Sequence, residues 1–208
     1  RFRRFLDRQD AEPERMRSQL MDEVVIHRTL YGISPFRWFK HTLILWGFAV
    51  MLGLEGLAVC FREVFPAVFG WHHLWAAGHP VRLVMDFAFD VTGLMILIGC
   101  ALALAWRVHV NGTDEQKYTD TPTAALLFLV VVTGFWVEGL RLAGLPMGAG
   151  ASFVGYALAA TVFSGADPNG TAYEILWLVH MAVACLFIGY VPVRRLIHTC
   201  ATPIGRLM

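Results

Sequence analysis

Long apolar runs separated by short polar segments make up most of the chain after residue 37. A membrane-spanning α-helix needs about 20 mostly apolar residues, so these runs predict helices that cross a bilayer. They cover residues 38 to 60, 84 to 106, 123 to 143 and 173 to 197. The apolar segment 145 to 167 is dense in small residues, and we expect a short helix that lies at the membrane interface or packs against the bundle rather than a further crossing. The predicted fold is an all-α integral membrane bundle with four crossings.

The first 37 residues have a different character. Residues 1 to 40 hold nine of the seventeen Lys and Arg together with six carboxylates. We expect residues 1 to 37 to form a polar cytoplasmic connector and residues 38 to 208 to form the transmembrane domain. The chain opens with the basic run RFRRFLDR and no initiator Met, so we also expect a fifth spanning helix upstream of Arg1.

Composition excludes an ordinary soluble domain. The hydrophobic set makes up 57% of the 208 residues and only 16% are charged, whereas about a quarter are charged in typical soluble domains. The four Cys residues are scattered without a CxxC motif, so they predict neither a disulfide framework nor a zinc or iron–sulfur site. The net charge of +1 identifies no partner. We expect the lipid bilayer around the chain and no nucleic acid bound to it.

The distribution of basic residues predicts the orientation. With four crossings, residues 1 to 40, 107 to 121 and 194 to 208 lie on one side, and they carry fourteen of the seventeen Lys and Arg. Basic segments next to spanning helices stay in the cytoplasm. We therefore expect a multi-pass membrane protein with its carboxyl terminus in the cytoplasm.

The last apolar run carries two histidines, His180 and His198, eighteen residues apart. On an α-helix this spacing is about five turns, so both imidazoles point to one side, about 27 Å apart along the axis. Ionisable side chains within a spanning helix usually face the bundle interior and mark function. A neutral imidazole is a common axial ligand of haem iron. The alternative is two unrelated histidines that hydrogen-bond to neighbouring helices.

Partners for these histidines can be sought at the same depth. His41, at the cytoplasmic end of the first span, matches His198, and a haem between them would have both imidazoles as axial ligands. His180 needs a partner near the outer surface, where the first span offers Met51, a residue type that pairs with His in cytochromes. One of three loop histidines could also fold back toward His180: His72, His73 or His79.

Charged side chains gather in the outer half of the predicted bundle. Arg82 and Asp86 share one face of the second span with Asp90, Glu55 lies in the first span, and Glu138 and Arg141 lie in the third. We predict a quinone and proton site there, with Glu55, Arg82 and Asp86 as its catalytic residues, because a carboxylate can accept the protons that an oxidised quinol releases. The alternative is a set of interhelical ion pairs that fix the packing.

The segment LVHMAVACLFIGYVPVRRLIHTCATP resembles the last helix of the cytochrome b (gamma) subunit of respiratory nitrate reductase and of heterodisulfide-reductase-like membrane subunits. The matching features are the two His, the Pro before a basic pair and the short Pro-containing tail. The stretch FKHTLILWGF looks like that family's earlier ligand helix. The resemblance implies that His41 and His198 hold an inner haem and that His180 is one ligand of an outer haem. Where the nitrate reductase pattern has a second His, this chain has Met51, so the outer haem is His/Met ligated, five-coordinate or absent.

The run TGFWVEGLRLA looks like relatives in which such a membrane domain is fused to a cytoplasmic iron–sulfur, heterodisulfide-reductase-type domain. The resemblance therefore implies a haem-binding membrane b-type cytochrome domain with one or two haem b groups, in a prokaryotic cytoplasmic (inner) membrane. It would pass electrons between the quinone or menaquinone pool and a cytoplasmic iron–sulfur subunit or fused domain, as part of a quinone-linked oxidoreductase. Two alternatives stay open: another cytochrome b anchor, of the hydrogenase or formate dehydrogenase type, and a haem-free membrane anchor or proton-coupled transporter.

Overall fold

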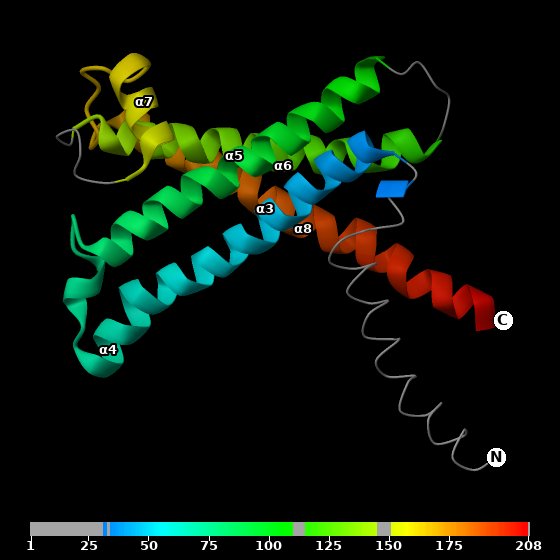
Figure 1. Cartoon of the computed structure of the whole chain (residues 1–208), viewed down its shortest axis with the longest axis horizontal. Helices are drawn as coiled ribbons and strands as arrows, with labels where there is room; N and C mark the ends of the chain where they lie inside the picture. The colour runs from blue at the N-terminus through cyan, green and yellow to red at the C-terminus, as the bar shows by residue number, and fades with distance from the viewer. Residues whose placement is uncertain (1–30, 33, 110–114, 145–150, 208) are drawn as a thin grey trace, which may run out of the picture. The chain divides into compact units, whose positions relative to one another are not determined.

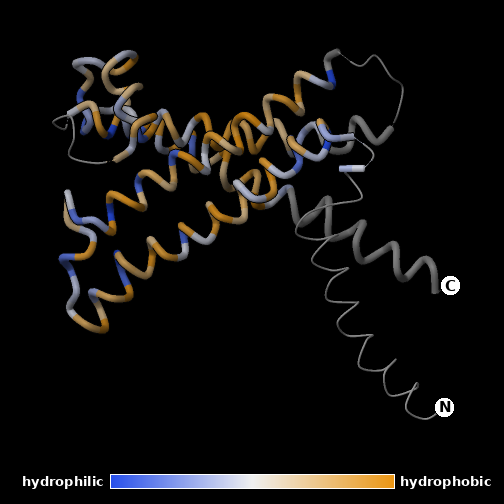
Figure 2. The backbone as a smooth tube through the Cα atoms, viewed as in Figure 1, coloured by the Kyte–Doolittle hydropathy of each residue, from blue (hydrophilic) through white to orange (hydrophobic). Residues whose placement is uncertain are grey.

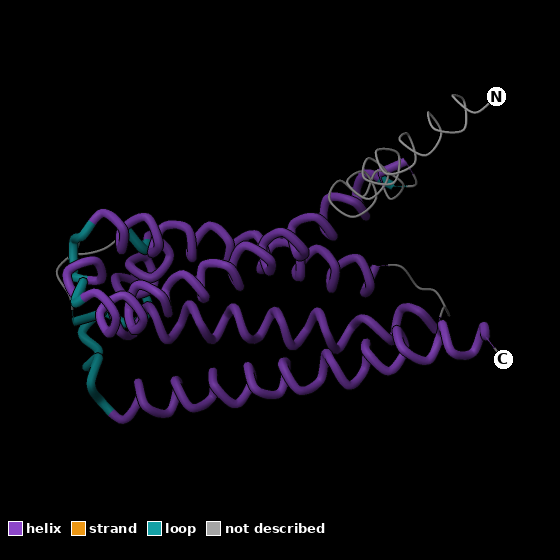
Figure 3. Tube along the Cα trace, turned by 90° about the horizontal axis from the view of Figure 1, so that it is seen from below, coloured by secondary structure: helices purple, strands orange, loops and turns teal. Residues whose placement is uncertain are grey.

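The computed structural model describes residues 31–32, 34–109, 115–144 and 151–207, with side chains for these residues except 108–109, 115–120 and 191–207. The regular elements in this part of the chain are helices, and no strand occurs among them (Figure 3). Four segments are long and apolar enough to cross a membrane: Pro35–Phe69, Pro80–Arg107, Thr121–Leu142 and Thr171–Tyr190. Apolar residues predominate along them (Figure 2). The prediction of an all-α membrane bundle with four crossings is confirmed.

The chain divides into two compact units, residues 1–42 and 43–208. In the first unit, Ser34 caps the start of helix α3 (Pro35–Val59), because its Oγ accepts a hydrogen bond from the backbone N–H of Arg37 at 3.4 Å. Pro35 occupies the first helical position, where no backbone N–H is needed. The predicted division of the chain at residue 37 stays a prediction.

The first span remains helical beyond its predicted end at residue 60. Helix α3 passes into a π-helical turn, η2 (Cys60–Val64), and then into α4 (Phe65–Phe69). Phe61, Phe65 and Phe69 follow one another at intervals of four residues, and successive ring centroids are 5.3 and 6.1 Å apart. Such i,i+4 contacts favour a helix. They keep the segment helical even though Arg62 and Glu63, inside the π-helical turn, interrupt its apolar pattern. The helix ends at Gly70, whose φ of 70° suits a glycine cap.

Three more long helices complete the second unit: α5 (Pro80–His109), α6 (Glu115–Leu142) and α8 (Thr171–Leu207) (Figure 1). A 3₁₀ turn, η3 (His72–Trp75), leads toward α5. Helix α7 (Phe153–Thr161) has only nine residues, so it is about 13 Å long against a bilayer core of about 30 Å. It packs on α6 and α5. The small-residue segment thus contains a short packed helix, as expected.

The core of the second unit lies where α5, α6 and α8 meet, and its buried residues are Ile96, Cys100, Leu127, Val131 and Phe187. Two glycines bring α3 close to α5. A Cβ at Gly47 would lie 2.8 Å from Ile96 Cγ1, and a Cβ at Gly99 would lie 2.7 Å from Ile44 Cγ1. Small residues at such crossings allow membrane helices to pack closely.

Candidate functional site

His180 lies on α8, facing α6, and its side chain is half-buried. Its Nδ1 is 2.9 Å from the hydroxyl oxygen of Thr133. The neighbouring residue on α6, Gly134, leaves room for the imidazole, since a Cβ there would lie 3.3 Å from His180 Cε1. One predicted ligand is therefore held inside the bundle by a side-chain hydrogen bond and a glycine on the next helix.

In the sequence, Thr133 and Gly134 are marked only as the first residues of the run TGFWVEGLRLA, with no role of their own. The usable signal was a Thr–Gly pair in the middle of the third span, because small residues and hydroxyls mark the contact faces of membrane helices. Such a pair indicates that this face of the helix contacts another helix, but it does not indicate which residue it contacts. Only the tertiary structure shows that the partner is His180, forty-seven residues along the chain.

The predicted inner pair, His41 and His198, stays a prediction. His41 is an exposed residue in the part of α3 that belongs to the first unit. His198 lies on the same continuous helix as His180, as predicted, but its side chain lies outside the described residues.

Met51, the predicted second ligand of the outer haem, packs against the core, and its Sδ lies 3.8 Å from Thr92 Oγ1 on α5. His180 instead faces α6, and the contacts found among the described side chains include none between Met51 and His180. The His180–Met51 pair stays a prediction.

The loop histidines contact their own neighbourhood. The rings of His73 and His79 lie 5.9 Å apart, and His79 Nδ1 accepts a hydrogen bond from the backbone N–H of Val81 at 3.3 Å. His72 is exposed in η3. Within the described part of the chain, no contact joins any of the three to His180, and no group of three or more His, Cys, Asp or Glu gathers as metal ligands.

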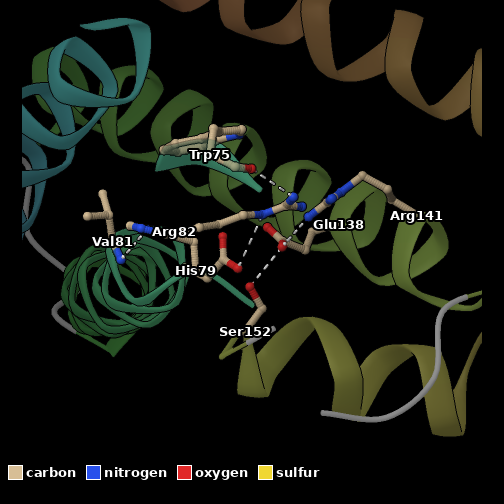
Figure 4. Close-up of polar contacts among 8 residues, drawn as sticks. Trp75, His79, Val81, Arg82, Glu138, Arg141 and Ser152 are labelled. Atoms are coloured by element: carbon tan, nitrogen blue, oxygen red, sulfur yellow. Dashed lines mark hydrogen bonds and ion pairs between the residues drawn. The ribbon is translucent and has the colours of Figure 1, made fainter. Parts of the chain in front are cut away.

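Arg82 and Asp86, two of the predicted quinone-site residues, lie together at the start of α5. Arg82 Nε is 4.0 Å from Asp86 Oδ2, and the Arg82 guanidinium also donates to the backbone carbonyl of Trp75 at 3.3 Å. Both side chains are largely shielded from solvent, with 23% and 15% exposed. Figure 4 shows the Arg82 side chain extending toward Glu138 and Arg141 on α6.

Glu138 joins α6 to the start of α7. Its Oε1 accepts hydrogen bonds from Arg141 at 2.9 Å and from Ser152 Oγ at 2.8 Å (Figure 4). A Cβ at Gly155 would lie 2.7 Å from Glu138 Cγ, so α7 rests directly on this glutamate. The carboxylate is therefore both paired with a cation and covered by a short helix.

Asp90 has a structural task that the sequence did not reveal. Its side chain is buried, with 1% of the residue exposed, and Oδ2 accepts the backbone N–H of Val154 at 2.7 Å. Val154 is the second residue of α7, where an N-cap side chain would normally bind. Ser152 stands at the N-cap position but bonds Glu138 instead. Asp90 thus caps α7 from another helix, which also suits the positive end of the helix dipole.

These side chains form one electrostatic unit, because the charges of Arg82, Arg141 and Glu138 act on Asp86, and those of Glu138 and Asp86 act on Asp90. We call these five residues the charged cluster. Glu55, the third predicted quinone-site residue, is exposed on α3. No contact found among the described residues joins it to the charged cluster. Each ion pair of the cluster lies within one helix, Arg82–Asp86 in α5 and Glu138–Arg141 in α6, so the alternative of interhelical ion pairs also stays a prediction.

Comparison with known proteins points to redox complexes. The chain is 28% identical to a subunit of the dihydromethanophenazine:CoB–CoM heterodisulfide reductase of Methanosarcina acetivorans over 192 residues, covering 90% of this chain and 64% of that protein. The corresponding Methanosarcina mazei protein is 27% identical, with 90% of this chain and 65% of that protein covered. An EtfAB:quinone oxidoreductase from Syntrophomonas wolfei is 25% identical over 81% of this chain and 24% of its own length. The chain is similar to subunits of oxidoreductases.

The chain spans just under two thirds of the heterodisulfide reductase subunits and about a quarter of the quinone oxidoreductase. No family model and no solved structure matches it. The similarity to heterodisulfide reductase subunits agrees with that part of the expected resemblance, and the four long apolar helices support a multi-pass membrane protein. The likeness to nitrate reductase gamma subunits and the haem stay predictions.

Proposed function

We propose that this chain is a membrane b-type cytochrome domain that passes electrons between a quinone-type carrier and a cytoplasmic iron–sulfur subunit or fused domain. The names of its relatives support the carrier, since one is a quinone oxidoreductase and the others act with dihydromethanophenazine. The observation that carries the haem is His180, an imidazole anchored inside the bundle on the helix that also bears His198.

The donor set fits a haem. A b-type haem needs imidazole or thioether side chains within spanning helices, and the chain supplies His180, His198, His41 and Met51. His180 is held through Nδ1, and the hydrogen bonds found among the described residues include none to its Nε2. A bound haem would supply one-electron transfer. The helices would hold the ligands and keep water away from the site.

The charged cluster is the proposed carrier site. A quinol that gives up two electrons also releases two protons, and a carboxylate near the reacting hydroxyl can accept one. Asp86 and Glu138 are the two carboxylates of the cluster left for this work, and each is paired with an arginine, Arg82 and Arg141 respectively. Asp90 is committed to the cap of α7. Glu55 remains a candidate for the proton path. The orientation proposed from the basic residues puts this cluster on the outer side and the carboxyl terminus in the cytoplasm of a prokaryotic inner membrane.

The haem proposal is tested by a reduced-minus-oxidised spectrum of the purified protein with a pyridine haemochrome count. We expect a b-type band that His198→Ala or His41→Ala reduces through loss of the inner haem; where the count gives a second haem, His180→Ala should remove it. His72→Ala, an exposed loop variant, is the matched control and should leave the spectrum unchanged. Protein made with haem available that binds none would overturn the proposal and favour a haem-free anchor or transporter.

The carrier site is tested by stopped-flow reduction of the protein with a quinol analogue. Asp86→Asn should slow reduction at least tenfold, because a general base contributes about 10²–10⁴-fold to a proton transfer. Glu63→Gln is the control, since Glu63 is an exposed residue whose carboxylate lies 3.8 Å from Arg62. Equal rates for Asp86→Asn and the unchanged protein would remove Asp86 from the site.

A further inference from the structure

The hydroxyl of Thr133 has three polar neighbours. Its Oγ1 lies 2.7 Å from the Leu129 carbonyl oxygen, 3.1 Å from the Val130 carbonyl oxygen and 2.9 Å from His180 Nδ1. Carbonyl oxygens can only accept hydrogen bonds, whereas a neutral imidazole has one donor nitrogen and one acceptor nitrogen. The single hydroxyl proton therefore decides how the imidazole is protonated.

The short distance to Leu129 decides where that proton lies. Two oxygens 2.7 Å apart need a proton between them, so Thr133 donates to the Leu129 carbonyl. If the hydroxyl donated to His180 instead, its lone pairs would face the Leu129 carbonyl oxygen at that separation. With its proton used, Oγ1 can act only as an acceptor toward the imidazole. The Val130 carbonyl, 3.1 Å from the same hydroxyl, is likewise an acceptor.

We infer that Thr133 is the positioning residue of His180, holding the ring with its proton on Nδ1 and its lone pair on Nε2. Gly134 supports this position of the ring, because a Cβ there would lie only 3.3 Å from Cε1 of His180. The assignment of the proton stands on the geometry alone. Its meaning for iron rests on the proposed function.

This tautomer is the one that a haem ligand requires, since the unprotonated nitrogen binds the iron. An acceptor on the other nitrogen fixes the ring and makes the imidazole a stronger electron donor, and loss of such a partner typically lowers metal affinity about 10-fold to 100-fold. Stronger donation favours ferric iron. Removal of the Thr133 oxygen should therefore weaken haem binding and raise the midpoint potential.

The first experiment needs no haem. Full-length protein labelled with ¹⁵N-histidine is purified without haem, and the ring nitrogens of His180 are assigned through their loss in His180→Gln. We expect a protonated Nδ1 and a bare Nε2 in the unchanged protein. Thr133→Val, which keeps the side-chain shape but lacks the oxygen, should shift the Nδ1 resonance and speed exchange of its proton. Thr133→Ser should restore both.

Thr161→Val is the matched control. Thr161 also donates to a carbonyl four residues earlier, Ala157 at 2.6 Å, but it lies on α7 and is exposed. Its replacement should leave the His180 signals unchanged. Circular dichroism of each variant shows whether the helices are retained.

The second experiment uses the haem-loaded protein. Thr133→Val should lower haem affinity about 10-fold to 100-fold and shift the midpoint potential of the affected haem to more positive values, whereas Thr133→Ser and Thr161→Val should do neither. A proton found on Nε2 of His180, or His180 nitrogen signals that Thr133→Val leaves unchanged, would overturn the positioning role of Thr133 even if haem binds. The expected nitrogen signals in a protein that never binds haem would uphold the positioning role and reject the haem.

Discussion

Replacing Asp90 by Ala should loosen α7 without unfolding the bundle. The buried carboxylate accepts the Val154 N–H at 2.7 Å, and no N-cap hydrogen bond comes from the Ser152 side chain. Ala would leave that shielded N–H without its acceptor, and a buried donor without a partner costs about 1–3 kcal/mol. Replacement of an N-cap residue by Ala costs about 0.5–2 kcal/mol. We expect about 2 kcal/mol for local opening of α7, which speeds backbone exchange roughly 30-fold.

Relief of charge repulsion acts in the opposite direction, because Asp90 lies near Asp86 and Glu138. Asp90→Asn distinguishes loss of the acceptor from loss of the charge, because it removes the charge but keeps an oxygen that can accept the Val154 N–H. We expect this variant to exchange within about threefold of the unchanged protein, since removal of the charge costs less than removal of the acceptor.

The assay is hydrogen–deuterium exchange followed by mass spectrometry on peptides that cover residues 151 to 163, in detergent or nanodiscs. Asp167→Ala is the control, because Asp167 also accepts a backbone N–H, from Asn169 at 2.9 Å, but is exposed and local. Unchanged exchange of α7 in Asp90→Ala would refute the capping role. Equal acceleration in Asp90→Ala and Asp90→Asn would show that the charge, rather than the acceptor, holds the helix.

Two glycine variants test the helix contacts. Gly134→Ala should lower the affinity for haem, measured by titration of the haem-free protein, because its Cβ would lie 3.3 Å from His180 Cε1. Gly189→Ala is its control, because a Cβ at Gly189 would have nothing within 4 Å. Equal affinities of the two variants for haem would contradict the contact between Gly134 and His180. Gly47→Ala should destabilise the bundle by about 1–3 kcal/mol in thermal or denaturant unfolding, the usual cost of overpacking, because its Cβ would lie 2.8 Å from an Ile96 carbon. Gly53→Ala has open space around it and should unfold like the unchanged protein.

Much of the fold could be predicted because membrane spans are encoded locally. A long apolar run must become a helix in a bilayer, where each backbone polar group needs a partner within the segment. The four spans and the short α7 were predicted for this reason. The continuation of the first span through Phe69 was not, because it depends on aromatic contacts along the helix rather than on mean polarity.

The candidate site was predictable only in part. Spacing alone indicated that His180 and His198 share a helix, because helical periodicity is local. The shared face of α5 likewise brought Arg82 and Asp86 together. Glu55 was grouped with them by depth, but depth does not determine which way a side chain turns about its helix, and it is exposed on α3.

The sequence by itself determined the fold class, the approximate spans and the residue types available for haem and proton chemistry, because these follow from apolar length and helical repeat. Only the tertiary structure decided which side chains meet. It joined Thr133 to His180 across forty-seven residues and Asp90 to Val154 across sixty-four. Such pairs depend on the rotation and crossing of packed helices, which arise from close contacts such as Gly47 on Ile96. Those contacts produce no periodic pattern in the sequence, so the sequence alone does not predict them.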